Sequence, residues 1–394
     1  MLQKNKIGKF LQEEWTMRLV VCADAHFDSV FPLFRNNPRK TRLRQEEQRI
    51  AFSKAINEAK KIDAHLLLIP GDLFNSGSLS QETINFLIDS FNSIPDTFIV
   101  IAPGNNDPAS YNSVYHTTKW PENVYVFKRG LEALELSYGD SEEKVRVYGA
   151  AFPGHSCKQS LLRQNNTLPI LDNSFINLLV MHGTVCNDEE KSNCNPIYIK
   201  DLNTCGFDFC AFGHMHKFSE IITTEKTTYA YTGTCEGRSF AESGTCGILS
   251  GSITKDSVEM NFVKTSVREN NIVKVDISGL DSYDAVLDKI RSVCPNSEYI
   301  YKIILTGRKV NGLNLPLAKL TQELSTNYFY VKILAEFQDD INIELLKNEK
   351  SLRGCFVRSM AEKMESAENP ELLYEALCYG LQSFESEVHF NDNP

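Results

Sequence analysis

The stretch "MRLVVCADAH", residues 17–26, decides the fold class of this chain. Its apolar first half is typical of a strand buried on both faces, and it ends in an aspartate and a histidine two residues apart. An amphipathic helix pattern follows in "EEQRIAFSKAINEAKKI", residues 46–62, and the next buried strand pattern ends in "PGD" at residue 72. Buried strands that alternate with helices predict an α/β fold.

The same alternation continues toward the C-terminus. "SLSQETINFLIDSFNSI", residues 78–94, predicts a second helix, and Ser78, three residues before Gln81, indicates a capping box at its start. A third strand pattern ends in "GNND", residues 104–107. From about residue 124 to 265 strand patterns predominate, which favours a second sheet packed on the first with helices outside.

The length of 394 residues predicts a main domain with appendages. An apolar stripe near the C-terminus, formed by Leu373, Leu377, Leu381 and Phe384, lies on one helix face. It either packs within its own domain or binds a partner. We expect an N-terminal extension (1–16), a main domain (17–265), a small α/β accessory domain (266–345) and a helical C-terminal region (346–394).

Composition limits the location and the partners. Hydrophobic residues make up 42% and charged residues 23%, as in folded globular proteins. The apolar runs are shorter than the roughly 18 residues of a membrane-spanning helix, and the N-terminus lacks a secretory pattern, so we expect a soluble, cytoplasmic protein without a membrane partner. Eleven cysteines without a Cys-x-x-Cys pair predict reduced thiols. The net charge of −10 restricts any nucleic-acid contact to a local surface.

Seven side chains of metal-ligand type follow the ends of predicted strands, where sites form in α/β folds. In "DAH" and "HMH" the alternation of an extended backbone turns both ligands of each pair to one side. Carboxylate, imidazole and amide oxygen suit a pair of Mn²⁺, Fe²⁺ or Zn²⁺ ions, and Asp72 is the natural bridge between them. The predicted ligands are Asp24, His26, Asp72, Asn105, His182, His214 and His216.

The remaining histidines do not lie in motifs with other residues of metal-ligand type. A single histidine in a strand is more often a structural residue than a ligand, and each of the motifs is a weak signal by itself. Five motifs in order favour a binuclear site. We expect structural or surface roles for His65, His116, His155 and His389.

The ordered set D-x-H, GD, GN, H and GHxH resembles the calcineurin-like metallophosphoesterase superfamily over residues 17–265. Within it, "GDLF" before a helix, the segment "YTGTCEGRSFAESGTCGILS" at residues 231–250 and the small α/β unit are similar to the SbcD-type DNA-repair nucleases, especially the YhaO-like branch. The resemblance implies a two-sheet β-sandwich flanked by helices, with two divalent ions, of which Mn²⁺ is the best candidate. It assigns one ion to Asp24, His26, Asp72 and His216, and the other to Asp72, Asn105, His182 and His214.

The resemblance also implies partners. In those families the small domain caps the active site and helps to hold DNA, and the helices beyond it bind a coiled-coil ATPase of the SbcC kind. Relatives of this kind act as dimers, so a homodimer is expected here too.

One position departs from the family pattern, which usually reads GNH where this chain has Gly104, Asn105 and Asn106. In the family that histidine lies near the scissile phosphate, and a positioned acid or base contributes about 10²–10⁴-fold in rate. Asparagine donates a hydrogen bond but passes no proton near neutral pH, so reduced turnover is expected. Asn75 likewise stands where some relatives carry histidine. The candidate catalytic residues are Asn106, Asp107 and His182.

A basic segment, "FRNNPRKTRLR" at residues 34–44, follows the first metal motif. Five cations beside a metal centre are well placed to meet a phosphate backbone, and a solvated helix start is the alternative interpretation. The candidate DNA-binding residues are Arg35, Arg39, Lys40, Arg42, Arg44 and, in the glycine-rich segment, Arg238.

Together these signals favour a metal-dependent DNA phosphodiesterase, the nuclease subunit of an SbcCD-like complex. Two alternatives stay open. One is a catalytically weak DNA-binding scaffold that regulates an SbcC-like ATPase. The other is a phosphatase or cyclic-nucleotide phosphodiesterase that acts on small substrates.

Overall fold

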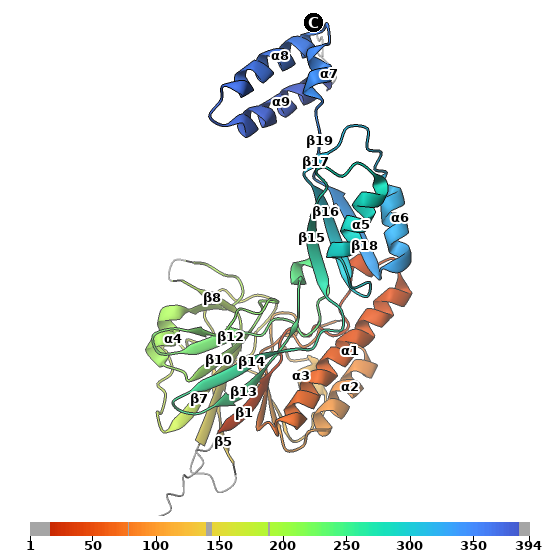
Figure 1. The fold of residues 1–394 in the computed structure, drawn as a ribbon. Coiled ribbons are helices and arrows are strands. Elements are labelled where there is room, and N and C mark those ends of the chain that lie inside the picture. The colour runs from red at the N-terminus through yellow and green to blue at the C-terminus, as the bar shows by residue number, and fades with distance from the viewer. Residues whose placement is uncertain (1–15, 78, 139–143, 188–189, 386–394) are drawn as a thin grey trace, which may run out of the picture. The chain divides into compact units, whose positions relative to one another are not determined.

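The computed structural model describes residues 16–77, 79–138, 144–187 and 190–385 (Figure 1). The chain divides into two compact units, Met1–Asn271 and Ile272–Pro394. Of the predicted N-terminal extension, only residue 16 is described. The division falls six residues after the predicted start of the accessory domain at residue 266, and the second unit includes the rest of that domain and the described part of the predicted helical region.

Parallel strands form the centre of the first sheet in unit 1. They are β1 (Met17–Val21), β2 (Leu66–Ile69), β3 (Phe98–Ile101) and β4 (Val124–Val126). Beside β1 the sheet continues with two antiparallel strands from the end of the unit. These are β13 (Gly247–Ile253) and β14 (Val258–Lys264).

The second sheet also has a parallel centre, with one antiparallel strand at each edge. Its parallel strands are β6 (Lys144–Gly149), β7 (Phe175–His182), β10 (Phe209–Gly213) and β12 (Thr228–Tyr231), and its edges are β5 (Glu132–Ser137) and β11 (Ile222–Thr223). A separate pair of short parallel strands follows β7, namely β8 (Thr184–Cys186) and β9 (Pro196–Tyr198).

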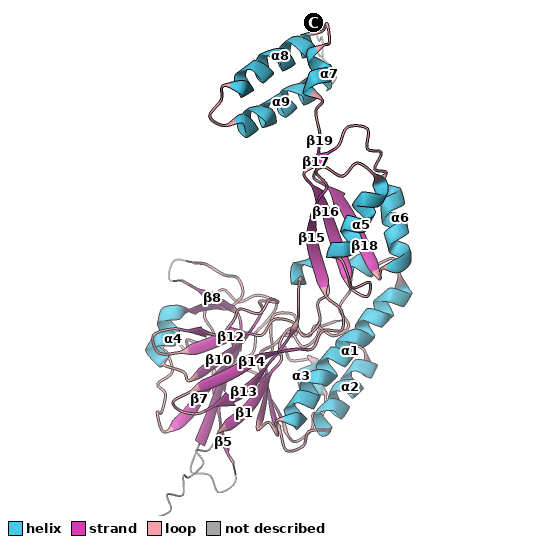
Figure 2. Cartoon of the chain, in the orientation of Figure 1, coloured by secondary structure: helices cyan, strands magenta, loops and turns pink. Residues whose placement is uncertain are grey.

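The two sheets pack face to face because alternate residues of their strands point into one shared core. Leu19 and Val21 of β1 lie in this core together with Leu178 and Val180 of β7. Val20, between the two β1 residues, points the other way and packs with the helix side chains. Unit 1 is therefore a two-sheet α/β sandwich flanked by helices, as predicted (Figure 2).

Helix α1 (Pro38–Lys61) covers the outer face of the first sheet. It begins earlier than the predicted residue 46, because Asn37 caps it and Pro38 fits the first helical turn. The Asn37 side chain accepts a hydrogen bond from the backbone amide of Lys40 at 3.1 Å. Most of the basic segment is therefore helical.

Helix α2 (Gln81–Asn92) lies beside α1 on the same face (Figure 1). Its N-cap is Ser80, whose hydroxyl accepts a hydrogen bond from the backbone amide of Thr83 at 3.2 Å. The predicted cap, Ser78, lies outside the described residues. The shorter helices of unit 1 are α3 (Val114–Thr117), α4 (Ile199–Cys205) and the 3-10 turns η1 (Pro32–Phe34) and η2 (Phe240–Glu242).

Unit 2 begins with a three-stranded sheet that is covered on one face by two helices (Figure 2). The strands are β15 (Asn270–Asp276), which spans the division between the units, β16 (Ile300–Thr306) and β18 (Tyr330–Ala335), and the helices are α5 (Tyr283–Val293) and α6 (Leu317–Asn327). Strand and helix alternate, as expected for a small α/β unit. The short strands β17 (Arg308–Lys309) and β19 (Gln338–Asp339) pair beyond this sheet.

Three helices end the described chain, and they are α7 (Ile343–Lys347), α8 (Leu352–Glu365) and α9 (Pro370–Glu385). From the predicted apolar stripe on α9, Leu377 and Leu381 are buried against Val357 of α8. Phe384 of the same stripe is 43% exposed. Packing within the unit therefore accounts for part of the stripe.

Two further expectations concern the whole chain. Each helix in the described ranges is too short or too polar to cross a bilayer. All eleven cysteines lie in the described part of the chain, and each is a free thiol.

Candidate metal centre

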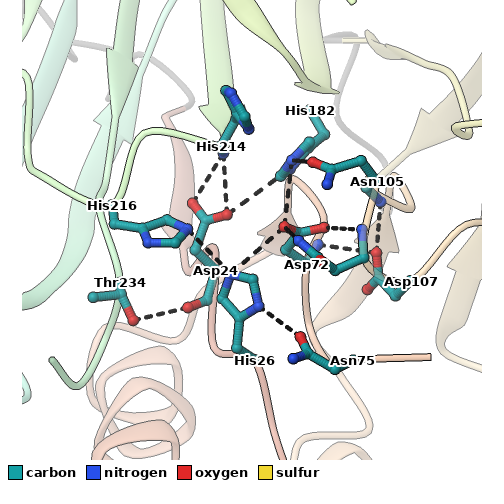
Figure 3. A network of polar contacts seen from close by, with 12 residues as sticks. Asp24, His26, Asp72, Asn75, Asn105, Asp107, His182, His214, His216 and Thr234 are labelled. Carbon is teal, nitrogen blue, oxygen red and sulfur yellow. Dashed lines mark hydrogen bonds and ion pairs between the residues drawn. The ribbon is translucent and has the colours of Figure 1, made fainter. Parts of the chain in front are cut away.

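The predicted metal ligands come together at the carboxyl ends of the parallel strands of both sheets (Figure 3). Asp24 and His26 follow β1, Asp72 follows β2, and Asn105 follows β3. From the second sheet, His182 ends β7, and His214 and His216 follow β10. The strand-end argument thus places all seven residues at one site.

The local backbone differs from the extended form that the sequence predicted. Asp24, His26, Asp72 and His214 have φ values of 51°, 49°, 51° and 99°, in the left-handed region. Non-glycine residues there cost about 1–3 kcal/mol each and persist only where surrounding contacts fix them. The alternation of an extended strand is therefore the wrong reason for the position of these ligands. Tight turns at the strand ends direct them inward.

The glycines of the GN and GH motifs are explained by close approach of the backbone to the ligands. A Cβ atom on Gly104 would lie 2.3 Å from Oδ1 of Asp72 and 2.8 Å from Nδ1 of His182. A Cβ atom on Gly213 would lie 2.0 Å from the carbonyl oxygen of Pro70. Any larger residue at either position would push the ligands apart.

The first ligand cluster contains Asp24, His26, Asp72 and His216, with one donor atom of each within 4.8 Å of the others. The Nε2 atoms of His26 and His216 are 3.1 Å apart. Nε2 of His26 lies 3.5 Å from Oδ2 of Asp72. Two imidazole nitrogens and two carboxylates that converge in this way form a suitable donor set for a divalent cation.

The second ligand cluster lies on the other side of Asp72. Nε2 of His182 is 2.9 Å from Oδ1 of Asn105 and 3.5 Å from the same Asp72 oxygen, Oδ2, that faces His26. Donor atoms of His182, His214 and Cys194 lie within 4.8 Å of one another. Because one Asp72 oxygen faces both clusters, Asp72 has the position of a bridging ligand.

Second hydrogen bonds fix the ligand nitrogen of three histidines. Nδ1 of His26 contacts Oδ1 of Asn75 at 2.8 Å, and Nδ1 of His182 contacts the Pro70 carbonyl oxygen at 3.1 Å. Nδ1 of His216 contacts Oε1 of Glu242 at 2.7 Å. Metal-bound histidines almost always donate their other N–H in this way, so Nε2 is left for the cation in each ring.

The electrostatics of the site favour cation binding. Burial and the neighbouring Asp72 carboxylate raise the pKa of Asp24 well above its usual value. Burial lowers the pKa of His182 and of His214 to about 4, so both rings are neutral and able to bind a metal near pH 7. Burial makes the ionised form of each of these carboxylates unfavourable, and a divalent cation next to them would stabilise that form. The residues present therefore fit two metal ions.

Asn106 contacts the bridging aspartate through two hydrogen bonds. Its backbone amide donates to Oδ1 of Asp72 at 2.8 Å, and its side-chain Nδ2 donates to Oδ2 at 2.6 Å. The amide group thus lies next to the metal positions, where the family histidine is expected. His155, predicted to be structural or at the surface, is exposed and contacts the backbone carbonyl oxygen of Asn105 at 2.8 Å through Nδ1.

The position of Asp107 does not fit the catalytic role predicted for it. Its carboxylate is buried and accepts hydrogen bonds from the backbone amides of Asp72, Leu73 and Gly104 and from the hydroxyl of Tyr115, at 2.6–3.0 Å. With all these donors around it, the carboxylate does not face substrate. Asp107 is a positioning residue that joins the loops after β2 and β3.

The predicted DNA-binding residues have unequal positions. Arg35, Arg39 and Arg42 are exposed, and Lys40 is partly buried. Arg44 is fully buried, so its inclusion among the DNA-binding residues is wrong. Its guanidinium group pairs with Glu47 and with Glu236, the latter at 2.7 Å.

Arg238 contacts the carboxylate that orients the ligand His216. Its Nη2 atom lies 2.7 Å from Oε1 of Glu242, the carboxylate oxygen that contacts His216. Burial alone raises the pKa of Glu242, but the hydrogen bonds from His216 and Arg238 outweigh it and lower that pKa to about 2. Glu242 is therefore an anion that orients His216.

Three residues of the site were not predicted as site residues. Asn75 and Glu242 orient histidine ligands, and Cys194 joins the second cluster. Asn75 and Glu242 had a weak signal, since both lie within stretches singled out by the family resemblance. Cys194 had none, because nothing in the sequence near it resembles a metal motif.

Comparison with known proteins agrees with this geometry. The family model of the calcineurin-like phosphoesterases matches residues 17–218. An uncharacterized metallophosphoesterase of Bacillus subtilis (strain 168), YhaO, is 23% identical over 252 residues, which are 62% of this chain and 60% of that protein. The matched part thus spans less than two thirds of that relative.

Solved structures that match part of the chain include the protein TT1561 of Thermus thermophilus, with a TM-score of 0.39, 8% identity, and coverage of 64% of this chain and 100% of that one. A dimetal phosphatase from Danio rerio has a TM-score of 0.36 at 9% identity, with coverage of 64% and 99%. The match of the family model includes all seven predicted ligands and spans just over half of the chain. The chain belongs to the calcineurin-like phosphoesterase family.

Proposed function

We propose that this protein is a Mn²⁺-dependent DNA phosphodiesterase, the nuclease subunit of a complex with an SbcC-like coiled-coil ATPase. The observation that carries the proposal is the position of Asp72, whose Oδ2 atom lies 3.5 Å from ligand nitrogens of both clusters. A carboxylate between two metal positions is the arrangement that two-metal phosphoester hydrolysis requires.

The two ions, when bound, supply an activated water and neutralise the charge on a phosphoryl oxygen. The chain itself holds and orients the ligands. Asn75, the Pro70 carbonyl and Glu242 fix three imidazole rings, and Asp107 holds the loops that carry Asp72 and Asn105.

The start of α1 supports DNA as the substrate. Arg39 and Arg42 are exposed in the first turns of this helix, and Arg35 is exposed just before it. Arg44, two residues after Arg42, ties the same turns to Glu236 in the segment that carries Glu242. Exposed cations on a helix that is tied to the segment carrying Glu242 are suited to the phosphate backbone of DNA.

The C-terminal helices are the proposed contact for the ATPase. After Leu377 and Leu381 are buried within unit 2, apolar side chains remain on the outside of α8 and α9. Leu352 is 76% exposed, Leu372 61% and Tyr379 64%. Exposed apolar side chains on a helix pair are typical of a surface for a partner helix.

Asn106 favours a second candidate function, a DNA-binding scaffold with weak or no turnover that regulates the ATPase. Its Nδ2 atom donates to the bridging Asp72 and offers no proton to a leaving oxygen near neutral pH. Metal and DNA binding do not need that proton, whereas hydrolysis is slower without it.

The test is a substrate panel assayed with Mn²⁺. Single-stranded, double-stranded and hairpin DNA are compared with small phosphomonoesters and cyclic nucleotides. Cleavage of DNA with little turnover of the small substrates is expected. Turnover restricted to the small substrates would contradict a nuclease.

The control for the panel is Asp72→Asn, which should lose metal and activity together. If no substrate is cleaved but DNA stimulates ATP hydrolysis by a coiled-coil partner, the scaffold function is correct.

A further inference from the structure

We propose that Cys194 is a sulfur ligand of the second metal ion, beside Asn105, His182 and His214. The inference goes beyond the proposed function, because it concerns the metal centre and does not depend on whether the substrate is DNA. Neither the predicted ligand set nor the motif that identifies the family includes a sulfur atom.

Distances in the second cluster carry the proposal. Sγ of Cys194 lies 3.3 Å from Nδ1 of His214 and 3.5 Å from Oδ1 of Asn105. That Asn105 oxygen is itself 2.9 Å from Nε2 of His182. The sulfur therefore faces the same point in space as the oxygen and the two imidazole rings.

These spacings match those of atoms bound to one cation. Metal bonds of about 2.1 Å to nitrogen and about 2.3 Å to sulfur place the two ligand atoms about 3.1 Å apart at a right angle and about 3.6 Å apart at the tetrahedral angle. The observed nitrogen–sulfur distance between His214 and Cys194, 3.3 Å, lies between these values. A cation can occupy this position without a large movement of either side chain.

The backbone holds Cys194 at this place from both sides. Its carbonyl oxygen accepts a hydrogen bond from the amide of Thr184 at 3.0 Å, and its amide donates to the Ser192 hydroxyl at 3.0 Å. The next residue, Asn195, is buried, has a φ of 40°, and donates from Nδ2 to the carbonyl oxygen of His182 at 2.7 Å. The loop that carries the thiol is thus joined directly to the strand that ends in a metal ligand.

Gly183 shows how closely the two segments approach. A Cβ atom at this position would lie 2.5 Å from the carbonyl oxygen of Asn195 and 2.8 Å from its Nδ2 atom. A side chain at residue 183 would therefore push the Cys194 loop away from His182. This contact gives the thiol a position fixed by the fold.

A sulfur ligand changes the expected metal preference. Thiolates favour Zn²⁺ and other borderline or soft ions over Mn²⁺, whereas carboxylates and amide oxygens accept Mn²⁺ readily. The thiol proton passes to solvent when the metal–sulfur bond forms, because a coordinating thiol is deprotonated. We therefore expect the second site to prefer a softer ion than the first site, which has carboxylates and imidazoles only.

The alternative is that the Cys194 thiol only donates a hydrogen bond to Asn105 or His214. Cobalt(II) separates the two cases, because a cobalt–thiolate bond gives an intense near-ultraviolet charge-transfer band and a hydrogen-bonded thiol gives none. The full-length protein is loaded with Co²⁺ under a phosphine reductant that does not bind metal. The band is expected in the native protein and absent from Cys194→Ser.

Cys157 offers a matched control. It pairs with Cys194 across a parallel β-bridge and is also partly buried, but its thiol contacts the carbonyl oxygen of Gln159 at 3.1 Å. The Cys157→Ser variant should keep the cobalt band. In the same proteins, Cys194→Ser should weaken Zn²⁺ binding by about 10–100-fold, the range for loss of a group that supports a metal site. Its Mn²⁺ affinity should change less.

A second measurement needs no variant. Zn²⁺ should protect Cys194, and leave Cys157 unprotected, against alkylation of the native protein followed by peptide mass spectrometry. A native cobalt spectrum with ligand-field bands but without the charge-transfer band would overturn the proposal, and so would a band that survives Cys194→Ser or equal alkylation with and without zinc. If no cobalt binds at all, the metal centre itself is wrong.

Discussion

The two carboxylate oxygens of Asp72 have different neighbours. Oδ1 accepts the backbone amide of Asn106, and Oδ2 accepts the Asn106 side chain while it faces His26 and His182 at 3.5 Å. The oxygen that would bridge two cations is thus the one that the Asn106 side chain contacts. An asparagine at this position therefore stabilises the ligand, and it supplies no mobile proton to the reaction.

Replacing Asn106 by histidine should raise turnover of DNA by about 10²–10⁴-fold, because an imidazole can protonate the leaving oxygen near neutral pH. The kcat values of both proteins are compared with saturating Mn²⁺. Metal content, measured on the same samples, should be equal, which separates proton transfer from metal loss. Equal kcat values would show that this position has no catalytic role.

Glu242→Gln tests whether the second hydrogen bond of His216 matters for metal binding. The carboxylate keeps a full charge next to the ring, and the substitution removes that charge while it preserves the shape. Affinity for one of the two ions should fall by about 10–100-fold, measured by calorimetric titration with Mn²⁺. The exposed Glu225→Gln carries the same charge change and should bind both ions as the native protein does. Unaltered titration of the Glu242 variant would remove this residue from the metal site.

At the scale of elements, the first turns of α1 have a buried face with a charge network and an exposed face with arginines. One face is buried through Arg44, which contacts Glu47, Glu236 and the carbonyl oxygen of Gly237. The other face exposes Arg39 and Arg42. The buried charge network fixes the helix beside the glycine-rich segment, and the exposed cations are then held in place without cost to their solvation.

Arg44→Met should destabilise unit 1 by about 3–5 kcal/mol, because it leaves the buried Glu236 without its cation and removes one of the two arginines that contact the buried Glu47. The free energy of unfolding is measured with denaturant. Arg42→Met is the matched control on the exposed face and should stay within about 0.5 kcal/mol of the native protein. A stable Arg44→Met protein would mean that packing, and not the ion pairs, fixes the start of α1.

The double variant Arg39→Glu, Arg42→Glu should weaken DNA binding and flatten its dependence on salt. Each lost phosphate contact removes close to one unit from the slope of log K against log salt concentration. Binding is measured at several salt concentrations for the native protein, the double variant and Glu46→Gln in the same helix, which should retain the native slope. An unchanged slope in the double variant would place the DNA contact elsewhere.

Elements were predictable wherever the apolar period was long and unbroken. The strands β1, β2 and β3 follow directly from their buried runs, and their polar ends predicted the metal ligands. Helix starts were less accurate, because they depend on single capping contacts. Asn37 begins α1 well before its amphipathic pattern is visible, and Ser80 caps α2.

At the scale of the whole molecule, the sequence predicted residues that repeat a family pattern and missed those that act only through the fold. Arg44 looks like its exposed neighbours in the sequence, and its burial depends on Glu236, almost two hundred residues away. Cys194 is brought to the metal centre by contacts with the loop after β7 and with Cys157. Local composition carries no information about such contacts, because two distant segments must be placed before either residue acquires its neighbours.

All the described metal ligands lie in unit 1, so metal binding should stabilise that unit alone. A ligand at about 100 times its dissociation constant adds about 2.7 kcal/mol per site to the folded state. Calorimetry of the full chain should therefore show one transition that rises with Mn²⁺ and falls with a chelator, and a second transition, from unit 2, that does not move. Asp72→Asn should abolish the shift of the first transition, since both ions lose their shared ligand. A shift of the second transition alone would place the metal outside the strand ends of the sandwich.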